Sequence, residues 1–385
     1  MTDLVVVSLE RWDDVWRRNQ ILLAGLLSAD PELRVLFVEP PADPLHALAG
    51  RRLPRRGAGL VARGRADGVP DGRLWTFQPT KWLPRRADAL LGRSADTRIA
   101  HAVLQVVRRL RLTAPLLWVN DPAGATLARI TSWPSLYDIT DDWLAAHRPP
   151  AQHARLRADE DFLMATCHTV VVCSEALART KGAVRPVRLV PNAVDLDAFR
   201  RPRPRPRDLP PGRVALYAGT VHPDRVDVGL CARLGDELRA TGLGTLVLVG
   251  PALLSERDVS VLRGTGVQLL GPRPYTTVPA YLQHADVLVV PHVVDPFTDS
   301  LDPIKLYEYQ AVARPVVSTP VAGFRDLHDP AVHVLDSRVF VDGVVSVLVG
   351  PPLPPGPLPQ SAVVPTWAER ITAMHDILVG LRATT

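Results

Sequence analysis

The chain has 385 residues, of which 46% are apolar and 22% are charged, so its length favours two domains and its composition is that of a globular protein. Aromatic residues make up only 5%, which argues against a base-stacking surface, and no nucleic-acid partner is expected. The formal net charge of +5 fits an enzyme that handles phosphorylated substrates or contacts an anionic membrane.

The first half of the chain alternates short apolar runs with segments of helical pattern. Strands are expected at residues 3–9, 34–41, 74–79, 115–121, 134–140 and 169–174. Helices are expected at residues 14–29, 98–112, from about 155, and 175–181. Continuous Val/Leu runs separated by helices are typical of a parallel sheet that is buried on both faces.

A second series of the same kind follows a segment rich in proline and arginine. Its strands are expected at 213–219, 245–251, 267–272, 285–292 and 315–319, and its helices at 228–240, 277–285 and 304–313. We predict an α/β protein with two tandem Rossmann-like, doubly wound parallel-sheet domains facing a central cleft. The expected division is a first domain at 1–198, a semi-rigid linker at 199–213 and a second domain at 214–365.

The sequence also argues against several other classes of protein and site. Cys167, Cys173 and Cys231 have neither disulfide nor metal-ligand spacing. No leader peptide and no apolar run of ~20 residues occurs, so a cytoplasmic protein is expected. The basic stretch 51–73 lacks a helix and aromatic interleaving, which favours a loop. Neither G-x-G-x-x-G after the first strand nor a P-loop motif is present, which excludes dinucleotide dehydrogenases and P-loop NTPases.

Lys305 and Glu308 form the pattern that says most about the chemistry of a possible binding site. Asp302 is a good N-cap and Pro303 suits the first helical position, so a helix is expected to begin here, after a strand that ends at the sheet edge. A lysine beside a helix N-terminus would hold a diphosphate, and the glutamate one turn later would accept hydrogen bonds from ribose hydroxyls. From spacing alone, a surface ion pair remains an equal alternative.

The stretch "DPIKLYEYQAVARPVVSTPVAGFRDL" resembles the donor-site signature of GT-B glycosyltransferases. Further segments resemble family-four-like bacterial members in the right order, among them "YDITDDW", "VVVCSEAL", "LVPNAVDLDAF", "ALYAGTV" and "PTWAERI". The resemblance is strongest to the branch that acts in cell-surface polysaccharide and natural-product glycosylation. It implies that the last helix, 366–385, packs back on the first domain.

The resemblance also implies roles for residues of the second domain. Lys305 would neutralise the donor diphosphate and Glu308 would hold the ribose. The other donor-site candidates are Gly219 and Thr220 in the turn after a strand, Arg225 as a second phosphate cation or a solvated loop residue, and Arg273 beside the nucleobase.

The pattern departs from the family at two positions. Ser300 stands where many members carry a glutamate that contacts the donor sugar, which leaves the recognition of that sugar open. Arg314 stands where the family has a glycine, so the helix is expected to end without the common left-handed glycine cap.

In the first domain, strand ends present polar residues that would face the acceptor. Asp121, Asp141 and Asp142 are candidates for the group that accepts the proton of the acceptor hydroxyl, with helix capping as the alternative for the latter two. The acceptor-side candidates are Arg11, Trp12, Arg18 and Asn120.

The predicted function is metal-independent transfer of a sugar from a nucleotide-diphosphate donor to a hydroxyl acceptor. The donor would be a UDP-, GDP- or dTDP-sugar with no tightly bound cofactor, and the acceptor a saccharide, a natural product or a lipid-linked molecule. The alternatives are a nucleotide-sugar epimerase-like enzyme on the same fold and a degenerate binding subunit. Whether the transfer retains or inverts the configuration of the sugar stays open, as does the oligomeric state of the protein. Residues 51–73 would either contact anionic lipid at the inner membrane face or form a surface loop.

Overall fold

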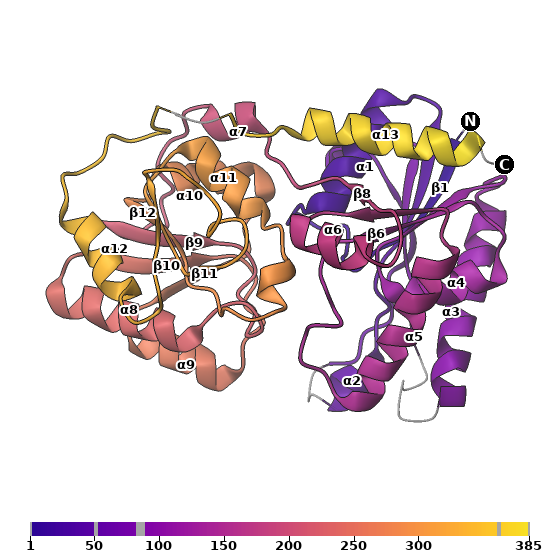
Figure 1. The fold of residues 1–385 in the computed structure, drawn as a ribbon, viewed down its shortest axis with the longest axis horizontal. Helices are drawn as coiled ribbons and strands as arrows, with labels where there is room; N and C mark the ends of the chain where they lie inside the picture. The colour runs from indigo at the N-terminus through magenta and orange to yellow at the C-terminus, as the bar shows by residue number, and fades with distance from the viewer. Residues whose placement is uncertain (1, 50–52, 82–88, 360–362, 384–385) are drawn as a thin grey trace. The chain divides into compact units, whose positions relative to one another are not determined.

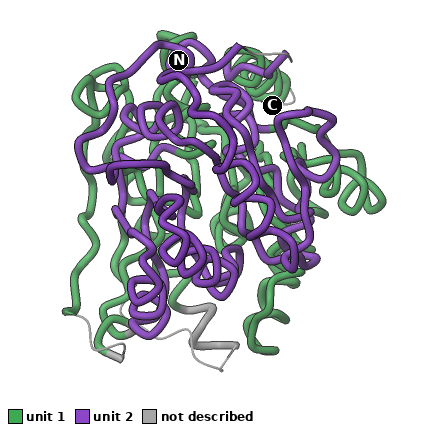
Figure 2. Tube along the Cα trace, turned by 90° about the vertical axis from the view of Figure 1, so that its left-hand side faces the viewer, with its two compact units in different colours: residues 1–13, 17–191, 368–385 green, residues 14–16, 192–367 purple. Residues whose placement is uncertain are grey.

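The computed structural model describes residues 2–49, 53–81, 89–359 and 363–383, and the chain divides into two compact units. Unit 1 comprises Met1–Asp13, Arg17–Pro191 and Ala368–Thr385, and unit 2 comprises Asp14–Trp16 and Asn192–Trp367 (Figure 2). Each unit is an α/β body built on its own sheet (Figure 1).

The sheet of unit 1 runs in the order β3-β4-β2-β1-β5-β6-β7-β8. Its strands are β1 (Thr2–Val7), β2 (Leu33–Val38), β3 (Gly59–Arg63), β4 (Leu74–Gln78), β5 (Leu116–Val119), β6 (Ser135–Ile139), β7 (Thr169–Val172) and β8 (Arg188–Leu189). Its helices are α1 (Arg18–Ala29), α2 (Pro44–Ala49), α3 (Ala89–Arg109), α4 (Ala125–Ile130), α5 (Pro150–Thr166), α6 (Glu175–Gly182) and α13 (Trp367–Ala383), with short 3₁₀ turns η1 (Arg65–Asp67) and η2 (Pro122–Gly124).

The predicted parallel sheet is confirmed in unit 1, with an exception at one edge. β3 pairs antiparallel with β4, and it lies in the basic stretch that we expected to form a loop. That expectation is wrong for Gly59–Arg63, because the apolar residues of "GLVAR" supply an edge strand despite the surrounding arginines. Arg51 and Arg52 of this stretch lie outside the described residues.

The sheet of unit 2 runs in the order β11-β10-β9-β12-β13-β14, and its paired strands are parallel. Its strands are β9 (Val214–Ala218), β10 (Thr245–Val249), β11 (Gln268–Gly271), β12 (Val287–Val290), β13 (Val316–Ser318) and β14 (Val332–Val334). Its helices are α7 (Leu196–Arg200), α8 (Val228–Thr241), α9 (Glu256–Gly264), α10 (Val278–Gln283), α11 (Ile304–Val312) and α12 (Phe340–Val349), with 3₁₀ turns η3 (Tyr275–Thr277) and η4 (Thr298–Ser300).

Both faces of the unit 2 sheet are buried, as its apolar strands predict. Val214, Leu216 and Ala218 of β9 pack in one core cluster with residues of α10 and α11. The alternate residues Ala215 and Tyr217 pack in the opposite cluster with residues of α8 and α12. Because side chains alternate along a strand, helices on the two faces hold β9 between them.

Residues 199–213, which we expected to form a linker, are grouped with unit 2. Phe199 is fully buried in a core cluster of that unit, and the Arg203 backbone N–H donates to Gln283 Oε1 at 2.9 Å. At the other end, Ile371 of α13 lies against Gly25 of α1 in unit 1, where a Cβ on the glycine would lie 2.1 Å from Ile371 Cδ1. The domain boundaries themselves stay a prediction.

Helix α11 begins one residue later than expected. Its N-cap is Pro303, which makes no side-chain cap hydrogen bond. Asp302 is instead bound to other partners: its Oδ2 accepts from the Asn192 backbone N–H at 2.5 Å and its Oδ1 accepts from Tyr307 Oη at 2.7 Å. The expected N-cap role of Asp302 is therefore wrong, because its carboxylate holds the chain near Asn192.

The end of α11 agrees with the prediction that no glycine caps it. Ala313 adopts the left-handed conformation with φ 54° and ψ 30°. Arg314 follows it and is buried, and its Nη2 donates to the carbonyls of Gln283, Pro354 and Gly356 at 2.5–2.7 Å. The arginine that replaces the expected glycine thus joins three chain segments of unit 2.

Candidate functional site

The order of strands in unit 2 places a switch point between β9 and β12. β9 pairs with β10 on one side and with β12 on the other, so the connections leave the two strands in opposite directions. Ligands of open α/β sheets bind at the carboxyl ends of the strands at such a point. Here those ends lead to Gly219 after β9 and to His292 after β12, and α11 follows β12 in the chain.

Gly219 and Gly250 allow the backbone to come close to Lys305. Both have φ values that favour glycine, 142° and 141°. A Cβ on Gly250 would lie 2.1 Å from the carbonyl oxygen of Gly219, and one on Gly219 would lie 3.4 Å from Lys305 Nζ. The turn after β9 therefore leaves room for the lysine ammonium next to the main chain.

Lys305 is partly exposed and lies beside an aromatic ring. Its Nζ is 5.1 Å from the ring centroid of Tyr217, which is within the range of a cation–π contact. Burial, with a smaller contribution from the charge of Arg225, lowers the pKa of Lys305 to about 8. A bound anion would favour the charged form of this lysine.

Glu308 is buried, with 7% of its surface exposed. Burial raises its pKa to about 7, against the opposing effect of Lys305. Within the described ranges, neither the side chain of Glu308 nor that of Lys305 makes a hydrogen bond or an ion pair. The alternative of a surface ion pair is therefore wrong: the two groups share a face of α11 but do not pair.

Two cations and a histidine converge at this point of the sheet. Arg225 is partly buried, with its guanidinium carbon 5.5 Å from the ring centroid of Phe297. His292 is buried with its Nε2 3.3 Å from Tyr217 Oη, and burial together with Lys305 and Arg225 holds the pKa of His292 well below its usual range. The site thus combines a neutral histidine with positive groups whose mutual repulsion an anion would relieve.

His292 and Tyr217 were not among the residues that the sequence pointed to. Tyr217 Oη donates a hydrogen bond to the Thr220 carbonyl oxygen at 3.2 Å, and this bond holds the turn that contains Thr220 against β9. The available signal was the histidine that ends "ADVLVVPH", directly after a buried strand. Its proximity to Lys305 depends on strand order, which the sequence does not specify.

The side chains of Ser300 and Arg273 make hydrogen bonds to other groups of unit 2. Ser300 is buried in η4, and its Oγ donates to the Phe297 carbonyl at 2.7 Å. The Arg273 guanidinium pairs with Asp208 at 2.6 Å and donates from Nε to Tyr281 Oη at 2.9 Å. Their roles toward a donor sugar and a nucleobase stay predictions.

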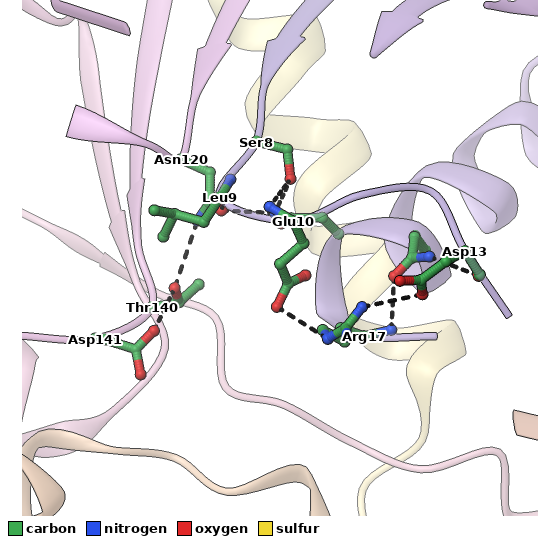
Figure 3. A network of polar contacts seen from close by, with 10 residues as sticks. Ser8, Leu9, Glu10, Asp13, Arg17, Asn120, Thr140 and Asp141 are labelled. Atoms are coloured by element: carbon green, nitrogen blue, oxygen red, sulfur yellow. Dashed lines mark hydrogen bonds and ion pairs between the residues drawn. The ribbon is translucent and has the colours of Figure 1, made fainter. Parts of the chain in front are cut away.

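In unit 1, Asn120 lies in a buried network at the carboxyl ends of β1, β5 and β6 (Figure 3). Its Oδ1 accepts from Asn19 Nδ2 at 2.7 Å, and its Nδ2 donates to the Asp138 carbonyl at 3.0 Å and to Thr140 Oγ1 at 3.5 Å. Thr140 Oγ1 in turn donates to Asp141 Oδ2 at 3.1 Å. The network connects Asn120 with Asp141, two of the residues that the sequence singled out.

The other two aspartates bind the protein itself. Asp121 accepts from the backbone N–H of Ala123 at 2.8 Å and so caps η2. Asp142 pairs with Lys181 at 3.1 Å, and the same Lys181 pairs with Glu160 at 2.6 Å. A role for these carboxylates in proton transfer stays a prediction.

The acceptor-side candidates differ in exposure. Arg11 is exposed. Trp12 is buried edge-on against Phe37, at 5.3 Å between ring centroids. Arg18 is buried with its Nη2 3.4 Å from Asp138 Oδ1. Their role toward an acceptor is not established by these contacts.

The described residues offer neither a metal cluster nor a membrane-spanning helix. No group of three or more His, Cys, Asp or Glu side chains in those residues could hold a metal ion. Across the same ranges, no helix combines the length and the apolar character needed to cross a bilayer. Cys167, Cys173 and Cys231 are free and buried.

Comparisons with known proteins point to one kind of chemistry. The family model described as "Glycosyl transferases group 1" matches residues 212–348. A protein of Bacillus subtilis (strain 168) described as teichuronic acid biosynthesis glycosyltransferase TuaH is 25% identical over 238 residues. That match covers 56% of this chain and 58% of the relative, so the chain spans less than two thirds of its length.

Solved structures resemble the whole fold. Sucrose-phosphate synthase from Thermosynechococcus elongatus has a TM-score of 0.66 at 16% identity, covering 100% of both chains. TarM from S. aureus, in a complex with UDP, has a TM-score of 0.56 at 9% identity, covering 91% of this chain and 93% of TarM. At these identities the likeness shows the fold alone, and it confirms the predicted α/β fold with two Rossmann-like units.

Proposed function

We propose that this chain, whose residues 212–348 match the family model of group 1 glycosyl transferases, transfers a sugar from a nucleotide-diphosphate donor to a hydroxyl acceptor. The observation that carries the proposal is Glu308, a buried carboxylate without a partner in the described part of the chain, one turn from Lys305. A carboxylate on a largely buried side chain that accepts no hydrogen bond from the protein leaves its oxygens available to donors of a ligand.

The nucleotide diphosphate supplies the groups that this site lacks. Its phosphates would be bound by the ammonium of Lys305, the guanidinium of Arg225 and the free backbone N–H groups at the start of α11. Its ribose would donate both hydroxyls to Glu308, which favours a ribonucleotide such as UDP or GDP over dTDP. The TarM complex supports UDP as one candidate, because UDP is bound by a protein of the same fold.

Catalysis would come from stabilising the diphosphate as it leaves. Lys305 and Arg225 would balance the charge that develops on the leaving group, in a site preorganised by buried neighbours. Asp141 is the proposed proton acceptor on unit 1, since the network around Asn120 holds its position. The transfer is proposed to need no metal, with the cations of unit 2 in the role that a metal would have.

Assays of product separate this function from its alternatives. Full-length protein with a panel of UDP-, GDP- and dTDP-sugars is expected to release nucleoside diphosphate, faster when a hydroxyl acceptor is added, and Lys305→Ala should lower that rate at least tenfold. An epimerase-like enzyme would interconvert the sugars without releasing nucleotide. A degenerate subunit would bind nucleotide and turn nothing over, which would contradict the proposal.

The proposed setting is the synthesis of a cell-surface polysaccharide or a natural-product glycoside in the cytoplasm, as the relative named for teichuronic acid suggests. A peripheral membrane contact is part of the proposal. Leu45, Leu48 and Leu53 are 40%, 56% and 82% exposed, and the exposed Arg55 and Arg56 follow them. Exposed leucines beside arginines suit an anionic lipid surface. Failure to co-sediment with anionic vesicles at low salt would exclude this contact.

A further inference from the structure

Tyr217 is a buried residue of β9 whose side chain reaches the turn beside Lys305. Its side chain is 1% exposed, and Gly219 follows it by two positions, directly after the strand. A Cβ on Gly219 would lie 3.2 Å from Tyr217 Oη and 3.4 Å from Lys305 Nζ. The tyrosine hydroxyl and the lysine ammonium therefore approach the same backbone turn.

The ring of Tyr217 contacts the side chain of Lys305. The distance from Lys305 Nζ to the ring centroid is 5.1 Å. A lysine has a flexible stem of four carbons, and a cation–π contact favours the conformations that keep its ammonium over the ring. The ring therefore restricts where the charge of Lys305 can lie.

The hydroxyl of Tyr217 makes hydrogen bonds on two sides. It donates to the Thr220 carbonyl oxygen at 3.2 Å and lies 3.3 Å from His292 Nε2. A phenol has one proton and a carbonyl only accepts, so His292 Nε2–H is the donor of the second bond. Burial, together with the charges of Lys305 and Arg225, holds the pKa of His292 well below its usual range, which keeps this imidazole neutral.

The backbone next to His292 holds the segment that carries the second cation. The Arg225 carbonyl accepts from the Val293 N–H at 2.8 Å, and Val226 pairs with His292 in an antiparallel bridge. Val226 also packs in the same core cluster as Tyr217. The hydroxyl of Tyr217 thus contacts a residue to which the Arg225 segment is bound.

Thr220 offers a backbone donor in the turn that Tyr217 holds. In the described part of the chain, the Thr220 N–H donates to no acceptor. Because the Tyr217 hydroxyl restrains the carbonyl of this residue, the turn stays beside Lys305 with an N–H that a phosphate oxygen can accept.

We propose that Tyr217 is a positioning residue of the donor site, whose ring holds the ammonium of Lys305 and whose hydroxyl holds the turn that contains Thr220. The proposal rests on the proposed function, in which Lys305 binds the donor diphosphate. Because its side chain is buried, Tyr217 acts through these two groups and not on the nucleotide itself.

Titration of the full chain with UDP separates the ring from the hydroxyl. Tyr217→Phe removes only the hydroxyl and should weaken UDP binding about threefold, through loss of the hold on the turn. Tyr217→Leu also removes the ring and should weaken UDP binding about tenfold or more. In a Lys305→Met background the two variants should bind UDP equally, because the ring then has no ammonium to hold.

The Lys305→Met background distinguishes positioning from a general loss of structure. If Tyr217→Leu weakens UDP binding more than Tyr217→Phe by the same factor with and without the lysine ammonium, the ring does not act through Lys305 and the proposal is overturned.

Tyr309→Phe is the matched control. Tyr309 is also 1% exposed, but it lies in the core cluster on the other face of the sheet, where its Oη accepts from the Ala218 N–H at 3.0 Å. This change removes one buried hydrogen bond to the backbone, as Tyr217→Phe does, and should leave UDP binding unchanged. An equal loss of affinity in Tyr309→Phe and Tyr217→Phe would contradict a specific role of the Tyr217 hydroxyl.

NMR of the ligand-free chain tests the ring contact without nucleotide. Lysine occurs only at positions 81, 181 and 305, so lysine labelling with ¹³C gives few signals, and Lys305→Met identifies that of Lys305. The ring current of Tyr217 should shift the ε-methylene protons of Lys305 upfield in the wild type and in Tyr217→Phe, but not in Tyr217→Leu. A wild-type signal without this shift would overturn the role of the ring even where Tyr217→Leu folds poorly.

The two measurements keep this proposal apart from the proposed function. UDP binding without the upfield shift would leave the donor site intact and remove the positioning role of the ring. The upfield shift without UDP binding would leave the contact between Tyr217 and Lys305 in place and remove nucleotide binding as its use.

Discussion

At the scale of single residues, the proposed role of Glu308 in ligand binding conflicts with the stability of the folded protein. Its pKa is raised to about 7 by burial, above the value near 4.5 of an exposed glutamate. The folded state therefore holds a proton that the unfolded state releases between these values. Glu308 costs stability progressively as the pH rises from about 4.5 to 7, and the cost is fully present above pH 7.

Glu308→Gln should therefore stabilise the ligand-free protein at pH 8 by about 1–3 kcal/mol and have little effect near pH 4.5. Thermal unfolding at both pH values measures the change. Glu160→Gln is the matched control, because Glu160 is also buried but pairs with Lys181 at 2.6 Å, so its loss should destabilise. A Glu308→Gln protein that is less stable at pH 8 would show that the carboxylate has a partner.

The pKa values of Lys305 and Glu308 also predict how nucleotide binding depends on pH. Above about 8 the ligand-free site loses the charge of Lys305, and below about 7 Glu308 becomes protonated. Affinity for UDP should be greatest between these values and fall on both sides. Calorimetry across pH 6–9.5 checks this, with Glu308→Gln removing part of the decline on the acidic side. Identical profiles for the wild type and the variant would contradict the assignment.

At the scale of elements, the turn after β9 is shaped by backbone contact between two glycines. A Cβ on Gly250 would lie 2.1 Å from the Gly219 carbonyl oxygen, so Gly250→Ala must displace the turn beside Lys305. Gly212→Ala is the control, since Gly212 also has a positive φ but a Cβ there meets nothing within 4 Å. Urea unfolding should show Gly250→Ala about 2–4 kcal/mol less stable than the control, and equal stabilities would contradict the packing.

Helix α11 shows what local sequence can and cannot predict. Its position after β12 and its lack of a glycine cap follow from the residues between Pro303 and Arg314. Its first residue does not, because Asp302 is held by Asn192, 110 positions away in the chain. Contacts of such long range override a favourable capping sequence.

At the scale of the whole molecule, alternation of apolar strands and helices was sufficient to predict two doubly wound units. The elements that it missed include β14 with three residues, β3 among arginines and the ten-residue helix α12. In the candidate site, Lys305 and Glu308 could be identified from spacing and resemblance. The burial of Glu308, and the approach of His292 and Tyr217 to Lys305, depend on the strand order β10-β9-β12 and could not be predicted from the sequence.

One titration tests the central claim, that Lys305 and Glu308 bind the two halves of a nucleoside diphosphate. Calorimetry of the full chain with UDP, GDP and dTDP is expected to show binding of at least one ribonucleotide. Lys305→Ala should weaken that binding about 10–100-fold, through loss of a charged phosphate contact. Glu308→Ala should weaken a ribonucleotide more than its 2′-deoxy counterpart. A wild-type protein that binds none of the three nucleotides, or a Lys305→Ala protein that binds as tightly as wild type, would contradict the claim.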